Sequence, residues 1–196
     1  MIVDIPAQPV ALEIQWRLRQ PTQVNRSEFT GRRRVTILSA APRWSAQVTM
    51  PPIQGEDNIL PWRAFFVRLQ GKAHSFRLIA CERDQTSAGP ITVKGGGQAG
   101  SSILTQGWGV AGEKLKAGHF ATINDQLLQL TAPVVANGAG EATLSFGPYI
   151  RFNPANAAPV EVRRPYALMS LSDEEAGWIA GKGQAYTVNF ACEESF

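Results

Sequence analysis

Turn-forming residues interrupt this chain every few positions, and this spacing limits the folds that it can adopt. Eighteen glycines and thirteen prolines are spread over 196 residues. Between them lie short segments rich in β-branched and aromatic residues, such as QWRLRQ, RRRVTIL, RWSAQVTM and SFRLIA, connected by PTQVNRSEFTG, SAAP and a proline pair. Segments of this length and composition are typical of strands. The sequence therefore predicts a mainly β protein.

One segment has a helical pattern instead. In GEDNILPWRAFFVRLQGK the apolar residues recur near helical spacing, and Gly71 is placed to end the helix. Asp57 or Asn58 is a suitable N-cap. Because proline is tolerated only in the first turn of a helix, Pro61 indicates a start near Leu60. We predict a helix over residues 60–70 that packs an aromatic face on a sheet.

The texture of the sequence changes at about residue 85, where a glycine-rich connector begins. Beyond it, HFATI, QLLQLTA, PVVA, EATLSF and VEVRRP are separated by turn signals at Asn124-Asp125, Asn137-Gly138 and Gly147-Pro148. The pair PVVA and EATLSF, joined through Asn137–Gly140, has the form of a hairpin. Such spacing predicts a small β-sandwich or barrel. We expect residues 91–165 to be inserted into a first β domain formed by residues 1–90 and 166–196.

Motifs that could carry chemistry are weak. Residues 95–100 fit the dinucleotide pattern G-x-G-x-x-G, but no helix is predicted after them to hold a pyrophosphate. His74 and His119 have no carboxylate or cysteine nearby in the sequence to complete a dyad or a metal site. Cys81 and Cys192 read as buried free thiols. We therefore predict no enzyme activity, no catalytic or metal-binding residue and no cofactor.

Charge is divided unevenly along the chain. Residues 1–45 hold seven arginines and three acidic residues, whereas residues 166–196 hold one lysine and five acidic residues. Opposite patches of this kind can join copies of a chain head to tail, although a solvated surface is the plain alternative. Trp108, between two glycines, is read either as an exposed interface anchor or as packed on its own domain. The candidate subunit interface comprises Arg32, Arg33, Arg34, Trp108, Asp173, Glu174, Glu175, Glu193 and Glu194.

The arginine run also admits a second partner. On a strand, Arg33 shares a face with Val35, and Arg34 shares the other face with Thr36. Contact with DNA phosphates is conceivable. Nucleic-acid binders that act on single strands pair such charge with aromatic residues, and only Phe29 is close. Salt bridges to an acidic neighbour, such as the C-terminal patch of another copy, are the favoured reading.

The order of features resembles that of tail proteins of long-tailed bacteriophages, and most of all distal tail proteins. The resemblance covers most of residues 27–165. It rests on SEFTGRRRVTILSAAPRWSAQVTMPP, then PWRAFFVRLQGKAHSFRLI, then SSILTQGWGVAGEKLKAGHF with the later NDQL and NGAG turns. The chain departs from the pattern at Gly118-His119, where an acidic residue is expected after the glycine. No functional residue is carried over, because such proteins act through surfaces.

The resemblance implies both a fold and a function. The implied fold is a tube-like β-sandwich or split-barrel domain with one helix, plus a small outer β domain. The implied function is a structural ring, expected to be a hexamer, that joins the tail tube to the tail tip or baseplate. Its partners would be other copies, the tail tube protein and tip hub or baseplate proteins, with passing contact to DNA.

The sequence also carries expectations about the location of the protein and about alternative functions. No leader pattern or bilayer-length apolar run is present in the sequence, so we expect a protein made in the host cytoplasm, located in the virion tail and not inserted in a membrane. A tube-end or head-tail joining protein is an alternative. A carbohydrate-binding module of a host-adhesion device is another, suggested by the compact β segment and the tryptophans. An enzyme, such as a hydrolase, is the least favoured.

Overall fold

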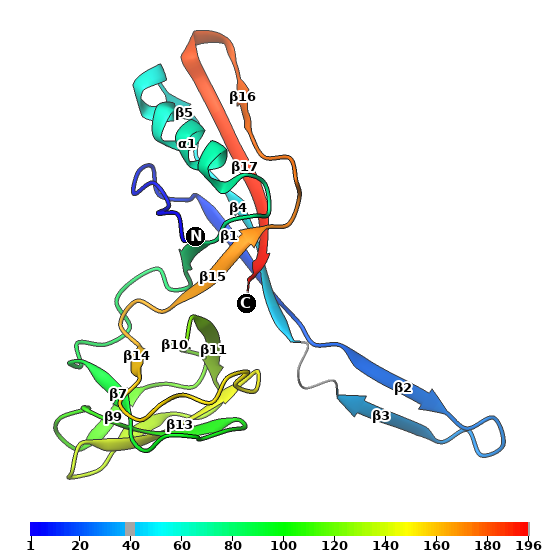
Figure 1. The fold of residues 1–196 in the computed structure, drawn as a ribbon, viewed down its shortest axis with the longest axis vertical. Helices are drawn as coiled ribbons and strands as arrows, with labels where there is room; N and C mark the ends of the chain where they lie inside the picture. Colours follow the sequence, from blue (N-terminus) through cyan, green and yellow to red (C-terminus); the bar gives the residue numbers. More distant parts are fainter. Residues whose placement is uncertain (38–41, 196) are drawn as a thin grey trace. The chain divides into compact units, whose positions relative to one another are not determined.

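The computed structural model describes residues 1–37 and 42–195, which form two units (Figure 1). The first unit comprises residues 1–17, 44–79 and 167–196, and the second comprises 18–43 and 80–166. The predicted insertion at 91–165 falls within the second unit, which starts eleven residues earlier, at Ala80, and also takes in 18–43. The connection expected at SAAP lies largely outside the described residues.

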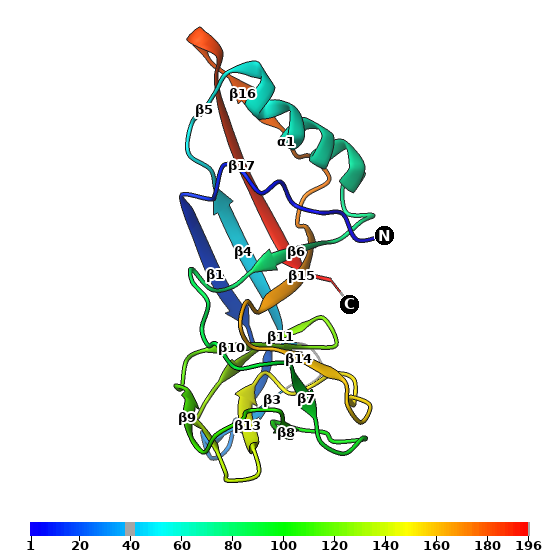
Figure 2. The ribbon, with the colours of Figure 1, turned by 90° about the vertical axis from the view of Figure 1, so that its left-hand side faces the viewer.

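The first unit is built on a seven-stranded sheet. Its central order is β1-β4-β17-β15-β6, and β5 and β16 both pair with β17. The elements of this unit are β1 (Glu13–Arg19), β4 (Arg43–Thr49), β5 (Ile53–Gln54), α1 (Glu56–Leu69), β6 (Phe76–Ile79), β15 (Tyr166–Leu171), β16 (Trp178–Ala180), the 3-10 turn η1 (Lys182–Gln184) and β17 (Ala185–Glu194). Segments from both ends of the chain therefore share one sheet, and Figure 2 shows β17 running along α1.

Helix α1 begins four residues before its predicted start. It spans Glu56–Leu69, so Pro61 lies inside the helix rather than at its start. Proline in that position removes one intrahelical hydrogen bond. The loss is offset by the buried face formed by Ile59, Trp62, Phe65, Phe66 and Leu69. The end agrees with the prediction to within one residue, because Gln70 takes a left-handed conformation after Leu69.

Aromatic rings join the helix to the sheet. Phe65 lies 5.3 Å from the ring of Phe76 on β6 and 6.4 Å from Phe190 on β17, measured between ring centroids. Trp62 lies 6.2 Å from Phe190. Edge-to-face and tilted contacts at these distances add stability beyond the apolar area that they bury. The prediction that an aromatic helix face packs on a sheet is confirmed.

The second unit contains a closed barrel of six strands in the order β10-β11-β13-β8-β7-β14. The elements described in this unit are β2 (Thr22–Arg26), β3 (Arg33–Ile37), β7 (Ile91–Val93), β8 (Ser102–Gln106), β9 (Gly112–Leu115), β10 (Phe120–Ile123), β11 (Gln126–Leu130), β12 (Val134–Ala136), β13 (Glu141–Gly147) and β14 (Pro159–Glu161). The predicted fold class is confirmed, because the described residues are mainly β, with one α-helix and a small barrel.

The predicted hairpin at Asn137–Gly140 is correct as a turn but wrong as a strand pair. Gly140 has a φ of 73°, and the Asn137 side chain accepts hydrogen bonds from the amides of Ala139 and Glu141. The two flanking strands enter different sheets, since β12 pairs with β9 whereas β13 pairs with β8 and β11. A Cβ on Gly140 would meet the backbone of Gly109 at 3.0 Å, so this turn packs on a neighbouring loop.

Three glutamine side chains fasten the loops of the barrel. Gln85 donates to the carbonyls of Phe120 and Val162, and accepts from the Phe120 amide. Gln126 donates to the Tyr149 carbonyl and accepts from the Arg151 amide. A side-chain amide carries a donor and an acceptor, as a peptide group does. Each of these side chains therefore bonds backbone groups that a neighbouring strand would otherwise bond.

The third glutamine explains the glycine-rich run. Gln98 donates to the carbonyls of Lys94, Gly95 and Leu104, and its Oε1 accepts from the Leu104 amide. The run is therefore a loop clamped between β7 and β8. Strand β8, and not a helix, follows the last glycine. The interpretation of residues 95–100 as a loop without a phosphate-binding helix is confirmed.

Candidate interaction surface

Strands β2 and β3 form a two-stranded hairpin of their own, which we call the arm (residues 22–37). Their register pairs Val24 with Val35 and Arg26 with Arg33. The sequence interpretation was wrong for residues 22–26, which were expected to connect strands and instead form β2. Arg32 precedes β3 and lies in the turn, whereas Arg33 and Arg34 lie on the strand.

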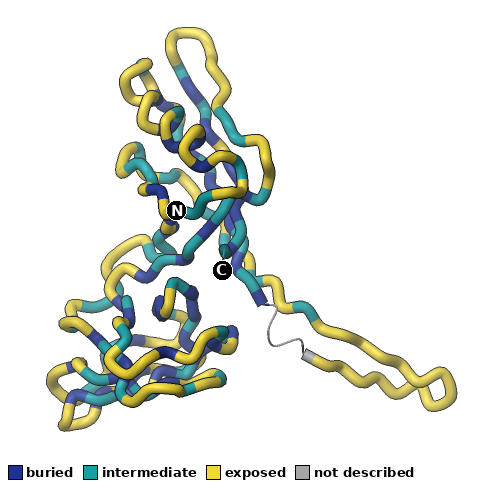
Figure 3. Tube along the Cα trace, in the orientation of Figure 1, coloured by how far each residue is buried: buried dark blue, intermediate teal, exposed yellow. Residues whose placement is uncertain are grey.

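No residue from 22 to 36 is buried or even half-buried, as the continuous exposed tube of Figure 3 shows. Two-stranded hairpins without a third strand or a packed helix are at best marginally stable in water. The arm also leaves the outer edges of both strands unpaired within the described residues. Its surface is therefore the part of the molecule that gains most from a partner.

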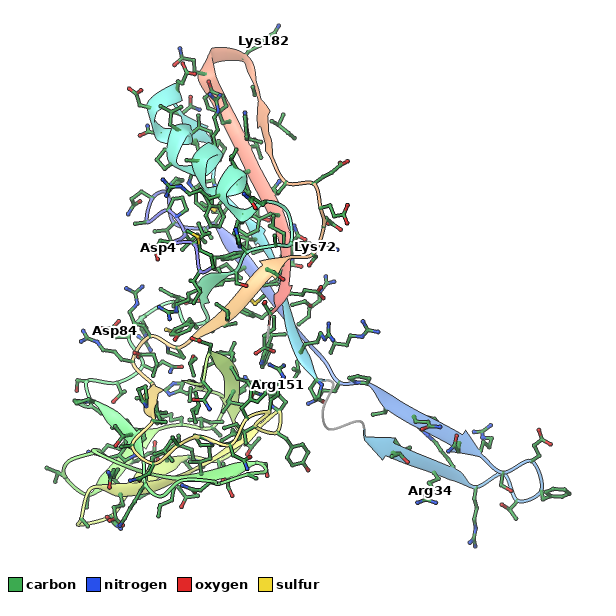
Figure 4. All side chains as sticks on the ribbon, in the orientation of Figure 1. Asp4, Arg34, Lys72, Asp84, Arg151 and Lys182 are labelled. Atoms are coloured by element: carbon green, nitrogen blue, oxygen red, sulfur yellow. The ribbon has the colours of Figure 1, made fainter. Side chains whose placement is uncertain are left out.

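The arm places like charges side by side. Residues directly opposite in an antiparallel pair share a face, so Arg26 and Arg33 lie together on the face that also carries Val24 and Val35. Like charges in this arrangement are destabilising. Within the described residues, none of the guanidinium groups of Arg26, Arg32, Arg33 or Arg34 forms an ion pair or a side-chain hydrogen bond. Figure 4 labels Arg34, which projects from β3.

The tip of the arm is a defined turn with an exposed aromatic ring. The Ser27 amide donates to the Arg32 carbonyl, and the Gly31 amide donates to the Ser27 carbonyl at 2.9 Å. The hydroxyl of Ser27 accepts from the Thr30 amide. Phe29 is 98% exposed at this tip. The arm thus combines an apolar tip, an apolar pair and a cluster of cations.

The acidic candidates separate into two groups. Asp173, Glu174 and Glu175 are all exposed in the loop between β15 and β16, which we call the acidic loop (residues 172–177). Glu194 is only 3% exposed and accepts a hydrogen bond from the Trp44 amide at 3.2 Å. The proposal of Glu194 as a surface residue is therefore wrong. Glu193, half-buried on the opposite face of β17, stays a candidate.

Trp108 is not an exposed anchor. It is 2% exposed in the core of the second unit, and its indole N–H donates to the Thr105 hydroxyl at 2.8 Å. The interpretation of Trp108 as an exposed residue is wrong, and the alternative, packing on its own domain, is right. Flanking glycines suggested a loose loop. They instead allow close approach, since a Cβ on Gly107 would lie 2.5 Å from the Pro90 carbonyl oxygen.

Strand β16 adds apolar surface beside the acidic loop. All three of its residues are exposed, and Ile179 is 70% exposed. Trp178 is fixed by the guanidinium of Arg63, which lies 5.0 Å from the centroid of its ring and 5.3 Å from that of Tyr186. A strand paired on one side only presents a row of unpaired backbone groups. Sequence reasoning missed this surface, although the proximity of Trp178 to the acidic triplet was visible.

The two cysteines are possible reactive groups, and histidines, cysteines and acids are possible metal ligands. Burial raises the pKa of the Cys192 thiol to about 12, and burial also raises the pKa of the half-buried Cys81. Both thiols therefore stay protonated and unreactive near neutral pH. The prediction of a buried thiol is confirmed for Cys192 but holds only in part for Cys81. In residues 1–37 and 42–195 no group of three or more histidines, cysteines or acids is arranged to hold a metal ion.

The part of the chain that the structure describes has no helix long and apolar enough to cross a membrane. No protein-family model matches the sequence, and no curated protein matches it significantly. The candidate surfaces are therefore defined by their own chemistry. One is the basic, exposed arm, and the other is the acidic loop that leads into β16, which pairs only with β17 among the described residues.

Proposed function

We propose that this protein is a structural component of a bacteriophage tail that assembles with copies of itself into a ring at the end of the tail tube. The observation that carries the proposal is the arm, a hairpin with no buried residue between 22 and 36 and with guanidinium groups that form no ion pair within the described residues. Such a hairpin is marginal alone. Contact between subunits would supply the missing packing and countercharge.

Open edges support the same conclusion. Among the described residues, β1 ends the seven-stranded sheet on one side, and β16 pairs only with β17. The apolar residues of β1, Ile14, Trp16 and Leu18, are only half-buried, as expected for an edge strand that a neighbour would cover. Rings of identical subunits use two different patches of one chain in each contact. The arm and the acidic loop offer such a pair of different patches.

The position in the tail rests on the resemblance to distal tail proteins. In this proposal the ring is a hexamer that joins the tail tube protein to the tip hub or baseplate, and it allows DNA to pass. A tube-end or head-tail joining ring would use the same surfaces. The protein acts through assembly and not as an enzyme.

The oligomeric state of the purified protein tests the proposal. Light scattering and negative-stain electron microscopy at high protein concentration should find closed rings. A variant with residues 23–36 replaced by a short glycine-serine turn should keep the cooperative thermal unfolding of the rest of the chain but lose the rings. If the intact protein stays monomeric at every concentration and also with tail tube and tip proteins added, the proposal is wrong.

A carbohydrate-binding role is a second candidate with one observation in its favour. Tyr149 and Phe152 are exposed on the loop that follows β13, and this loop is fastened by Gln126. Aromatic faces held on a rigid loop suit stacking on a sugar ring. Glycan-array binding by the intact protein, lost in Tyr149→Ala with Phe152→Ala, would support this role. Absence of binding to every glycan would remove it.

A further inference from the structure

We propose that the arm of one copy docks on the acidic loop and strand β16 of the next copy, with Arg26 and Arg33 facing Asp173, Glu174 and Glu175. This inference rests on the proposed ring and names its contact. It is narrower than the function, because a ring could also close through other surfaces.

The arm and the acidic loop carry opposite charges. Arg26 and Arg33 are opposite each other in the register, and an anion placed between them would turn their repulsion into attraction. The described residues of this chain give these guanidinium groups no ion-pair partner. Asp173, Glu174 and Glu175 are equally without an ion pair there, and all three are exposed. The two sets therefore complement each other across two copies.

Apolar content selects a protein partner over nucleic acid. Val24 and Val35 lie on the same face of the arm as the arginine pair, about 7 Å along the strands, the span of two strand residues. DNA phosphates would satisfy the arginines but would leave this valine pair in water. The acidic loop continues directly into β16, where Trp178 and Ile179 are exposed. The receiving surface thus offers acidic and apolar groups in adjacent positions, as the arm does.

The receiving loop also has fixed geometry at both ends. The Ser172 amide donates to the Ala191 carbonyl on β17 at 3.0 Å. A Cβ on Gly71 would lie 3.4 Å from the Glu174 carbonyl oxygen, so the loop packs closely on the turn that follows α1. At its other end, Trp178 is held by Arg63. A surface held in place loses less entropy on binding than a free loop.

A charge exchange between two variants of the full chain tests the contact. The first variant carries Asp173→Lys, Glu174→Lys and Glu175→Lys, so its arm and loop are both basic. The second carries Arg26→Glu and Arg33→Glu, so both are acidic. Each variant alone should need about a tenfold or greater increase in concentration to assemble, because attraction becomes repulsion. An equal mixture should assemble like the wild type, because each arm then meets a loop of opposite charge.

A matched control makes the outcome specific for the arm variant. A variant with Arg83→Glu and Lys116→Glu has the same change in net charge as the arm variant, at exposed sites outside the arm, and it should assemble normally. Recovery on mixing shows that both variants are folded and that the contact joins different copies. The inference is overturned if either variant assembles alone like the wild type or if the mixture fails to recover.

Two further outcomes separate the inference from the function. If the arm variant assembles normally but loses binding to a short DNA duplex, the arm binds nucleic acid; the proposed contact is then wrong and the ring stands. If the wild type itself stays monomeric, also with tail tube and tip proteins added, the proposed function fails together with the contact. Light scattering of the four proteins and the mixture measures assembly, and a DNA-binding assay of the wild type and the arm variant measures binding to the duplex.

Discussion

The barrel and the arm are both all-β parts of one chain, yet they are stabilised in opposite ways. The barrel closes on itself, and its strands bury apolar residues such as Leu128, Leu144 and Phe146. The arm has two strands, two open edges and no buried side chain between residues 22 and 36. The barrel is therefore specified by its own core, whereas the arm has the composition of a surface that another molecule completes.

The side chains of the two regions also differ in the contacts that they form. Side chains in the barrel are used on the barrel itself, including polar groups such as Gln85 and Gln126, which bond backbone groups of neighbouring segments. The guanidinium groups of the arm form no hydrogen bond or ion pair within the described residues. Substitutions should therefore change stability in the barrel and assembly in the arm, and the following predictions would break or sharpen that distinction.

The largest effect is expected from a cavity in the barrel core. Phe146→Ala removes a fully buried ring, and such changes cost about 3–5 kcal/mol in the free energy of unfolding. Hydrogen-exchange mass spectrometry of barrel peptides measures this loss. Val135→Ala, an exposed site in the same unit, is the matched control and should change little. An equal effect of both substitutions would mean that the barrel core is not the source of its stability.

A smaller but still large effect is expected at Gly107. Its φ is 100°, and an added Cβ would lie 2.5 Å from a backbone oxygen. Gly107→Ala should lower the free energy of unfolding by about 2–4 kcal/mol, because it adds strain in the positive-φ region and forces the backbone to shift. Gly109 also has a positive φ but has open space around it, so Gly109→Ala should lower the free energy of unfolding by about 1 kcal/mol. Comparable losses at both glycines would show that close packing beside Trp108 contributes nothing.

The sequence predicted those features of the barrel that depend on residues close together in the chain. Turn residues and short apolar runs predicted the barrel strands, because both signals are local. They did not predict that Trp108 is buried, because its packing in the core of the second unit and the tight approach of Gly107 to Pro90 arise only after the chain folds back. Two flanking glycines are compatible with an exposed loop, whereas in the structure Gly107 permits close contact with Pro90.

Of two further errors, only the first had a signal that could have been read. In β17 the alternation of Tyr186, Val188, Phe190 and Cys192 continues to Glu194, which places this carboxylate on the buried face. In the arm, residues 22–26 alternate polar and apolar side chains too weakly to be recognised as a strand. Their pairing with β3 is a property of two segments together. The assignment of the arginine pair to one face required that register.

A moderate effect is expected from the glutamine clamp of the barrel. Gln98→Ala leaves the Leu104 amide and several carbonyls without their partner and should cost about 1–2 kcal/mol. Hydrogen exchange at β7 and β8 should report the loss locally. Gln23→Ala, in the arm, removes the same side chain from an exposed position and should leave exchange unchanged. Faster exchange in the barrel caused by the Gln23 variant would contradict the independence of the two regions.

The smallest effect on stability is expected in the arm, where the contrast with the barrel is most direct. Val24→Ala combined with Val35→Ala removes an apolar cross-strand pair that is exposed, so the free energy of unfolding of the isolated chain should change by less than about 0.5 kcal/mol. The same variant should raise the concentration needed for assembly, because those valines are proposed to be covered only in the ring. Denaturation and light scattering on one preparation compare the two quantities. Loss of stability without loss of assembly would reverse the roles assigned to barrel and arm.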